Sequence, residues 1–310
     1  MATLKELAQR PDRFTGGHRA CAGCAAPIAV RQVMAALDPE IPVVTANATG
    51  CLEVTSTIYP FTAWKGSYIH CAFGNAAATL SGVESAYRSL KRQGKIADRP
   101  MKFVAFGGDG GTYDIGFQSL SGAMERGHDL VYICYDNGAY ANTGIQRSSA
   151  TPRGASTTTS PAGRVIGGKP QQRKDLTAIM VAHDIPYVAQ ASVSHYMDLM
   201  RKVEKAFATD GPAFINVMSP CRLTWGTPPE ETIEVAREAV ESCFWPLYEV
   251  VDGVWKLTYK PRQKTSFIDW MKRQARFRHL FKPEPKTEIL AELQADVDKR
   301  WEQLLARVEA

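Results

Sequence analysis

The stretch Lys102–Gln146, KFVAFGGDGGTYDIGFQSLSGAMERGHDLVYICYDNGAYANTGIQ, decides the fold. It opens with an apolar run at 103–106 and then breaks into a glycine-rich turn at 107–111. Helical character follows over 115–126, and a second apolar run covers 130–135. Strand, glycine turn, helix and strand in this order predict a βαβ unit.

The glycine turn contains one acidic residue, Asp109, at a place suited to a phosphate. Glycines permit a close backbone approach, and the start of a helix offers free N–H groups to an anion. A bare carboxylate would repel that anion unless a cation lay between them. We therefore expect Asp109 to bind Mg²⁺. Because the next parallel strand ends beside the turn, the amide oxygen of Asn137 and the carbonyl of Ala139 are expected as further ligands.

The spacing of this motif is informative as well. Gly108-Asp109-Gly110 is followed after 26 residues by Asn137, which resembles the thiamine diphosphate motif. The usual second half of that motif is Asn-Asn, whereas this chain has Asp136-Asn137. An isolated glycine turn would be interpreted as part of an ordinary doubly wound sheet. Strand, helix, strand and oxygen ligand in register favour the cofactor.

Seven cysteines, an odd number, argue against a disulfide framework and favour metal or cluster ligation. Four of them lie in turns or at strand ends and are the candidate ligands: Cys21, Cys24, Cys51 and Cys221. Three lie among apolar or aromatic neighbours and are expected to be packed thiols: Cys71, Cys134 and Cys243.

The pair Cys21-x-x-Cys24 by itself fits a redox dithiol, a zinc site or an iron–sulfur site. A thioredoxin-like dithiol needs the pair at a helix start after a strand, and this pair follows a polar turn. Zinc sites more often have two such pairs. One pair with two distant cysteines leaves zinc and a [4Fe–4S] cluster both open.

Composition excludes several classes of protein. The chain has 45% apolar and 22% charged residues, which is ordinary for a globular protein. A net charge of +5 without a basic arm or a known motif does not favour nucleic-acid binding. No stretch approaches 18 uninterrupted apolar residues, and the N-terminus has no long apolar core, so we expect a soluble cytoplasmic protein without membrane contact.

At 310 residues the chain can hold one large α/β domain and an extension. We place the cofactor domain at 1–228 and a C-terminal extension at 229–310. The extension ends in an amphipathic helix at 286–308, which should pack on this domain or on a partner. Residues 68–74 are expected to be a loop. The long segment 147–173 has no period and is expected to be functional, as a clamp over the site or a contact to another chain.

Longer matches extend the motif. The chain resembles the β subunit of the pyruvate:ferredoxin oxidoreductase family, the 2-oxoacid:ferredoxin oxidoreductases, over most of residues 16–228. The matching segments are GHRACAGCAAPIAVR, TGCLEV, GDGGTYDIGFQSLSGAMERGH, YDNGAYANTGIQRS, TPRGASTTTSP and PAFINVMSPC.

The resemblance implies an α/β fold with a thiamine diphosphate-binding-type parallel sheet flanked by helices. It implies Mg²⁺ on Asp109, Asn137 and Ala139, and a [4Fe–4S] cluster on Cys21, Cys24, Cys51 and Cys221. The cofactor-binding residues it implies are Gly108, Asp109, Gly110, Gly111, Asn137, Ala139, Asn142 and Thr143. Asn142 is also a candidate catalytic contact on the reacting side, although it fits a simple turn residue as well.

The implied reaction is the oxidative decarboxylation of a 2-oxoacid, most simply pyruvate, with coenzyme A as acyl acceptor and ferredoxin as electron acceptor. The implied partners are an α-type subunit that completes the site, a γ-type subunit and a ferredoxin-like δ-type subunit. The glutamate that contacts the aminopyrimidine comes from another subunit in this family, so the chain alone should be inactive. For Glu53, the one exception considered, a structural role is preferred. Ala25 stands where the family often has glycine.

Three alternatives remain. The same family acts on oxalate, branched-chain or aromatic 2-oxoacids and 2-oxoglutarate, and much of the substrate pocket would lie on the partner. A non-redox thiamine diphosphate decarboxylase would leave the four cysteines unused. A zinc-stabilised assembly subunit would have kept the fold without the cofactor, although the intact Asp109 and Asn137 weigh against it.

Overall fold

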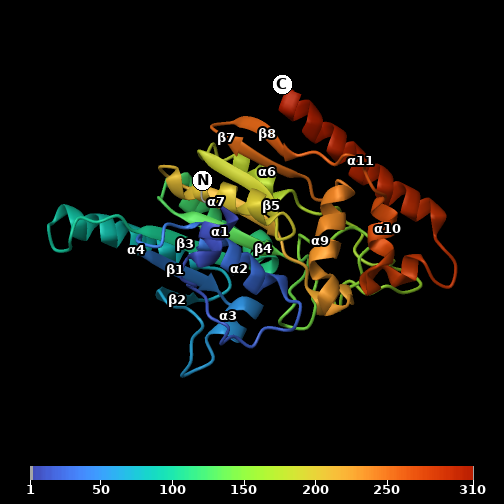
Figure 1. The fold of residues 1–310 in the computed structure, drawn as a ribbon. Coiled ribbons are helices and arrows are strands. Elements are labelled where there is room, and N and C mark those ends of the chain that lie inside the picture. The colour runs from blue at the N-terminus through green and yellow to red at the C-terminus, as the bar shows by residue number, and fades with distance from the viewer. Residues whose placement is uncertain (1–2, 310) are drawn as a thin grey trace.

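The computed structural model describes residues 3–309, whose strands form one mixed eight-stranded sheet (Figure 1). The strand order is β2-β1-β3-β4-β6-β5-β7-β8. Neighbours from β2 to β5 are parallel, whereas β7 and β8 are antiparallel to their neighbours. The strands are β1 (Val43–Ala48), β2 (Ser67–Cys71), β3 (Lys102–Gly108), β4 (Val131–Asp136), β5 (Tyr187–Ser192), β6 (Ala213–Met218), β7 (Leu247–Val251) and β8 (Val254–Tyr259).

Two hydrophobic cores lie on the two faces of the sheet. Successive side chains of a strand enter opposite cores: in β4, Val131 and Ile133 enter one, and Tyr132 enters the other. Helices α2 and α7 cover the first face, and α4 and α5 cover the second. Strands β4, β5 and β6 are buried along their whole length, as expected for parallel strands covered on both faces.

The α-helices are α1 (Leu4–Gln9), α2 (Ala25–Ala36), α3 (Cys51–Ser56), α4 (Ala76–Arg92), α5 (Phe117–Glu125), α6 (Leu176–Val181), α7 (Tyr196–Ala208), α8 (Arg222–Trp225), α9 (Thr232–Glu241), α10 (Phe267–Lys272) and α11 (Thr287–Glu309). A π-helix covers Gly110–Ile115, and 3₁₀ helices cover Pro229–Glu231 and Ala275–Leu280. Within residues 3–309, no helix is long and apolar enough to cross a membrane.

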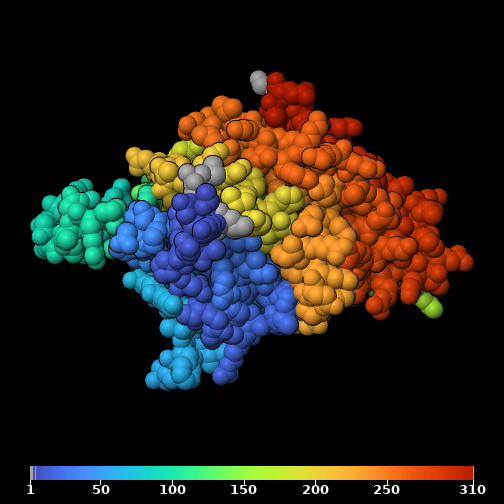
Figure 2. All heavy atoms as spheres, viewed as in Figure 1, coloured from blue at the N-terminus to red at the C-terminus, as the bar shows by residue number. Residues whose placement is uncertain are grey.

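The segment after residue 228 continues the same sheet. β7 pairs with β5, and β8 forms the edge. Helix α11 packs against β8 and α10, with Leu290, Leu293 and Leu304 buried. In Figure 2 this segment, orange to red, covers one side of the molecule. The final helix therefore lies against elements of its own chain.

The parallel sheet flanked by helices is confirmed, with two antiparallel strands added. The expected loop at 68–74 is wrong in its first part, because residues 67–71 form β2, an edge strand parallel to β1. The helix expected over 115–126 is preceded by the π-helix that the glycines form. The division at residue 228 stays a prediction.

Candidate cofactor and cluster site

Two parallel strands bring the halves of the motif together. Gly108 near the end of β3 pairs with Tyr135 of β4, so Asp109 and Asn137 follow neighbouring strand ends. The backbone N–H of Asn137 donates to Oδ1 of Asp109 at 3.2 Å. The tight turn after β4 is formed by Gly138, with φ of 75°, whose N–H donates to Asp136. The carboxyl ends of β1, β3 and β4 thus meet at one place, where ligands bind in open α/β sheets.

A pocket opens at these strand ends. Its lining includes all eight predicted cofactor-binding residues: Gly108, Asp109, Gly110, Gly111, Asn137, Ala139, Asn142 and Thr143. Thr49, Gly50 and Cys51, which follow β1, line it too. Asn142 and Thr143 are exposed at its mouth, whereas Asp109 is fully buried at its base. The residues predicted for cofactor binding therefore share one pocket.

The donor set around Asp109 fits a divalent cation. Burial raises the pKa of Asp109 well above its ordinary value, and the charge of Asp136 raises it further. The hydroxyl of Ser148 and the N–H of Asn137 donate to the carboxylate and lower its pKa in part. A bound cation would favour the ionised form, because it supplies the opposite charge that the buried carboxylate lacks. The amide oxygen of Asn137, which accepts from the N–H of Ala139 at 3.2 Å, is a further hard oxygen beside it.

Two glycines of the turn, Gly110 and Gly111, have no room for a side chain. A Cβ on Gly110 would lie 2.3 Å from Cε1 of Tyr140, whose hydroxyl donates to the Gly110 carbonyl at 2.8 Å. A Cβ on Gly111 would lie 3.2 Å from the carbonyl of Phe73. The chain thus comes closest to Tyr140 and Phe73 at glycines that line the pocket, and a helix that begins there offers N–H groups suited to the pyrophosphate end of thiamine diphosphate.

The four candidate cysteines lie on three segments that come together. The N–H of Cys24 donates to the Cys21 carbonyl at 3.0 Å, which closes the turn of the pair. Gly23 in that turn has φ of 72° and lies against the backbone of Pro229. The N–H of Ala25 donates to the carbonyl of Pro220 at 3.4 Å, which ties the turn to the segment of Cys221.

The pKa values of two of the four thiols, Cys24 and Cys51, are raised in part by the other candidate cysteines. Burial raises the pKa of Cys51 to about 12, and Cys221, Cys24 and Cys21 add to the shift. Burial likewise raises the pKa of Cys24 to about 11, with Cys221 and Cys21 contributing. Asp109 also contributes to the shift at Cys51, so the cofactor pocket and the thiols adjoin.

Within residues 3–309, no three His, Cys, Asp or Glu side chains converge closely enough to hold one metal ion. A [4Fe–4S] cluster asks for a different arrangement, because each of its cysteines binds a separate iron. Cys71, Cys134 and Cys243 are buried free thiols, as the sequence predicts.

Several residues of the site are absent from the motif. Arg173 donates to Asp136 at 2.6 Å, and its guanidinium lies 4.4 Å from the ring centre of Trp245. Trp225 donates from Nε1 to the Asn137 carbonyl at 2.7 Å. Arg276 lies over the ring of Trp225 at 4.3 Å. These residues surround the loop after β4 from behind the pocket.

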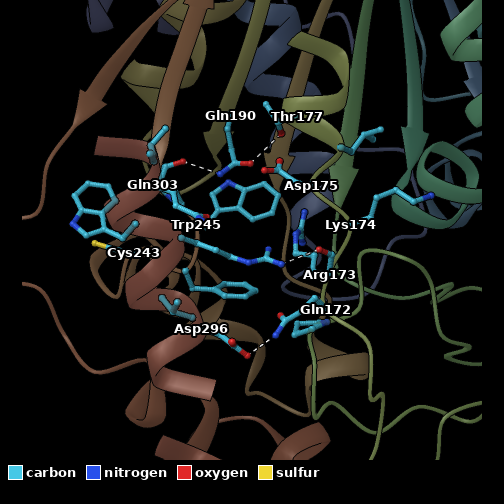
Figure 3. Close-up of a pocket in the computed structure, with 18 of the residues that line it drawn as sticks. Gln172, Arg173, Lys174, Asp175, Thr177, Gln190, Cys243, Trp245, Asp296 and Gln303 are labelled. Carbon is cyan, nitrogen blue, oxygen red and sulfur yellow. Dashed lines mark hydrogen bonds between the residues drawn. The ribbon is translucent and has the colours of Figure 1, made fainter. Parts of the chain in front are cut away.

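Arg173 also lines a second cavity, between α11 and the sheet (Figure 3). There Gln172 donates to Asp296 of α11, and Thr177 donates to Gln190 at 3.1 Å. Through Arg173 the wall of this cavity touches Asp136, next to the predicted magnesium ligand Asn137. The segment 147–173 forms no helix and only isolated β-bridges. Near its start, the hydroxyl of Ser148 donates a hydrogen bond to the carboxylate of Asp109.

Glu53 has local partners. Its carboxylate accepts from the hydroxyl of Thr57 at 3.0 Å and lies 3.5 Å from Nε2 of His70. The same His70 nitrogen lies 2.8 Å from Oγ1 of Thr49, a residue of the pocket wall. The structural role preferred for Glu53 agrees with these contacts and stays a prediction.

Comparison with known proteins identifies the family. Residues 48–217 match the family "Thiamine pyrophosphate enzyme, C-terminal TPP binding domain". "Pyruvate synthase subunit PorB" of Thermotoga maritima is 52% identical over 308 residues, 97% of this chain and 95% of the relative. The chain belongs to the β subunits of the 2-oxoacid:ferredoxin oxidoreductases. The resemblance seen in the sequence is thereby confirmed, and the chain is a subunit of an oxidoreductase with a thiamine diphosphate-binding domain.

Other relatives are also similar over most of the chain, at lower or comparable identity. "Pyruvate synthase subunit PorB" of Methanocaldococcus jannaschii is 55% identical over 87% of this chain and 91% of the relative. "Ketoisovalerate oxidoreductase subunit VorB" of Pyrococcus furiosus is 40% identical over 94% of this chain and 92% of the relative. Among solved structures, 2-oxoglutarate:ferredoxin oxidoreductase from Magnetococcus marinus has a TM-score of 0.57 at 21% identity, over 76% of this chain and 83% of that one. This likeness supports the fold.

Proposed function

We propose that this β subunit takes part in the oxidative decarboxylation of pyruvate, with coenzyme A as acyl acceptor and ferredoxin as electron acceptor. Support for pyruvate comes from relatives named pyruvate synthase at 52% and 55% identity, against 40% for the ketoisovalerate relative. The observation that most directly supports redox chemistry is the shared wall: Cys51 lines the same pocket as Asp109. An electron donor at the pocket and an acceptor at the thiols would thus be neighbours.

In this proposal Asp109, Asn137 and the Ala139 carbonyl would hold Mg²⁺, and the cation would supply the positive charge that a pyrophosphate group requires beside the buried carboxylate. Bound thiamine diphosphate supplies the carbon nucleophile and electron sink that decarboxylation requires. The chain's own contribution is to keep this end of the pocket dry and preorganised. Asp109 is fully buried, and Ser148 and the Asn137 backbone fix its orientation. The exposed Asn142 at the mouth is proposed as a polar contact to the reacting substrate.

Cys21, Cys24, Cys51 and Cys221 are proposed to bind a [4Fe–4S] cluster, which would accept electrons singly. Support comes from their mutual electrostatic effects and from the contact between the Cys24 and Cys221 segments. The elevated pKa values of Cys24 and Cys51 belong to the metal-free chain, and iron ligation would convert these thiols to thiolates.

The open mouth of the pocket is proposed to face an α-type subunit, which would supply the aminopyrimidine and substrate-carboxylate contacts. A γ-type subunit and a ferredoxin-like δ-type subunit would complete the complex. The cytoplasmic location and the inactivity of the isolated chain stay predictions.

One second candidate has its own support. The ketoisovalerate relative, at 40% identity over 94% of the chain, favours a branched-chain 2-oxoacid as the next substrate to test. To decide, the complex is purified anaerobically with its natural subunits. It is assayed for ferredoxin reduction with pyruvate, 2-oxoisovalerate, an aromatic 2-oxoacid, 2-oxoglutarate and oxalate, each with and without coenzyme A.

The proposal expects the highest kcat/KM with pyruvate and a requirement for coenzyme A. A preference for another acid would overturn the pyruvate assignment and leave the family intact. Decarboxylation without ferredoxin reduction would instead indicate a non-redox thiamine enzyme.

A further inference from the structure

A buried arginine from the C-terminal segment reaches the back of the site. Arg276 lies in the 3₁₀ helix Ala275–Leu280 and is 5% exposed. Its guanidinium lies over the ring of Trp225 at 4.3 Å, and its Nε donates to Oε1 of Gln274 at 2.8 Å. Its Nη1 approaches the carbonyl of Asn137 at 3.5 Å. No part of the cofactor motif or the cysteine pattern points to this side chain.

The charge of Arg276 has no carboxylate in direct contact within residues 3–309. A buried cation without such a partner is costly, so folds retain few of them. Burial lowers the pKa of Arg276 to about 9, whereas Asp136, Asp109 and Cys221 each act to raise it. The guanidinium therefore stays charged at neutral pH. The groups that act to raise this pKa belong to the end of β4, to the proposed magnesium site and to a proposed cluster ligand.

Trp225 connects the two sites that Arg276 faces. Its backbone N–H donates to the carbonyl of Cys221 at 2.9 Å, and its Nε1 donates to the carbonyl of Asn137 at 2.7 Å. The hydroxyl of Thr224 donates to the sulfur of Cys221 at 3.3 Å. Trp225 thus bonds to both loops, through its backbone N–H to Cys221 and through its indole to Asn137, and Arg276 packs on the face of the indole. The cation therefore packs on the residue that bonds to both loops.

We propose that Arg276 is a positioning residue whose buried charge, held on Trp225 beside the Cys221 turn, raises the reduction potential of the cluster at the four cysteines. This inference rests on the proposed function. Reduction adds one electron and no proton, so the cluster and its thiolates become more negative by one unit. A fixed cation nearby stabilises that more negative state, and net charge and hydrogen bonding are known determinants of cluster potentials. Electron uptake from the thiamine site would then be favoured.

The size of the effect follows from Coulomb's law. For unit charges about 10 Å apart at an effective dielectric constant of about 20, an equilibrium constant changes by roughly tenfold. For a one-electron couple, tenfold corresponds to about 59 mV.

The test is a dye-mediated redox titration followed by EPR, on the complex purified anaerobically with its natural subunits. The signal of this cluster is the one that Cys51→Ala removes, which separates it from clusters on other subunits. Arg276→Met and Arg276→Gln remove the charge, and Arg276→Lys keeps it when the titration is run at about pH 6, because burial lowers the pKa of a lysine more readily than that of an arginine. Arg273→Met is the matched control: this arginine of the same segment pairs at the surface with Glu231, Glu234 and Glu238.

We expect both neutral variants to make cluster reduction roughly tenfold less favourable, with Arg276→Lys and Arg273→Met within about threefold of the parent. An unchanged potential in the neutral variants would overturn the inference. So would an equal shift in Arg276→Lys, since packing and not charge would then be responsible. Failure of both neutral variants to assemble would overturn it too, because the charge would then serve folding. A parent complex without any signal dependent on Cys51 would refute the proposed function, and this inference with it.

Discussion

Replacing Trp225 with phenylalanine tests whether the loop after β4 is held from behind. The indole is 1% exposed and donates from Nε1 to the Asn137 carbonyl at 2.7 Å. Phenylalanine keeps a ring under Arg276 and beside Trp270 but removes the donor. Losing a hydrogen bond to a buried carbonyl costs about 1–2 kcal/mol, and the smaller ring in a buried site adds about 1 kcal/mol. We therefore expect a destabilisation of about 2–3 kcal/mol, or a fall in Tm of roughly 3–5 °C for a chain of this length.

The same change should weaken cofactor binding. Asn137 is a proposed magnesium ligand, and its backbone loses one of its anchors in Trp225→Phe. If the substitution destabilises the cofactor-bound state by about 1 kcal/mol more than the cofactor-free state, the affinity for Mg²⁺ and thiamine diphosphate drops roughly fivefold. Calorimetric titration of the cofactor-free complex measures this, and scanning calorimetry measures Tm. The control is Trp255→Phe on β8, where the indole is partly exposed and stacks on Tyr248. This substitution should change neither the cofactor affinity nor the Tm by much. Equal changes in Tm and in cofactor affinity in the two variants would refute the claim that Trp225 holds the loop after β4.

Three further predictions concern the pocket and the thiols. Asp109→Ala should abolish binding of thiamine diphosphate, measured calorimetrically, and leave the visible spectrum of the cluster intact. Cys51→Ala should remove the cluster spectrum and leave binding of thiamine diphosphate intact. Loss of both cofactors in either variant would refute independent sites. Burial raises the pKa of Asp109, and Mg²⁺ requires the ionised carboxylate. The affinity for Mg²⁺ should therefore rise with pH up to that pKa, and Mg²⁺ binding should release protons. Calorimetric titration in buffers of different ionisation enthalpy measures the protons released. The metal-free chain should show the opposite trend in stability: an acid with a raised folded pKa binds more protons when folded, so stability falls as pH rises from the unfolded to the folded pKa. Gly110→Ala should clash with Tyr140, destabilise by about 1–3 kcal/mol and weaken cofactor binding, whereas Gly82→Ala, which meets no atom within 4 Å, should stabilise α4 slightly in a thermal scan.

The sequence predicts the cofactor pocket well because its residues follow two neighbouring strands. Once 103–106 and 130–135 are recognised as parallel strands, the pleat and the register place Asp109 beside Asn137. The glycines and the short turn after β4 are encoded locally, in residue types with few alternatives. Eight predicted residues around one pocket follow from that local information.

The support behind the pocket could not be predicted in this way. Arg173, Trp225 and Arg276 reach the loop after β4 from 37, 88 and 139 residues further along the chain. No local period relates such positions, since contacts at this range depend on how helices pack on the finished sheet. A tryptophan four residues after Cys221 is a signal visible in retrospect.

One strand, β2, was missed, and the place of β7 and β8 in the sheet was not predicted, for a related reason. β2 is an edge strand with a mixed burial pattern, so neither strict alternation nor a continuous apolar run marks it. β7 and β8 do look like strands in sequence, but their sequence does not tell which sheet they join. Their pairing with β5 is decided by the free sheet edge that β5 offers.

The most direct test of the central claim is an anaerobic visible and EPR spectrum of the complex, with iron, sulfide and zinc analysis, before and after pyruvate is added with thiamine diphosphate and coenzyme A. The account predicts an iron–sulfur absorption band that bleaches on addition of pyruvate and a reduced-cluster EPR signal that depends on Cys51. A colourless, zinc-containing complex that does not respond to any 2-oxoacid would contradict it.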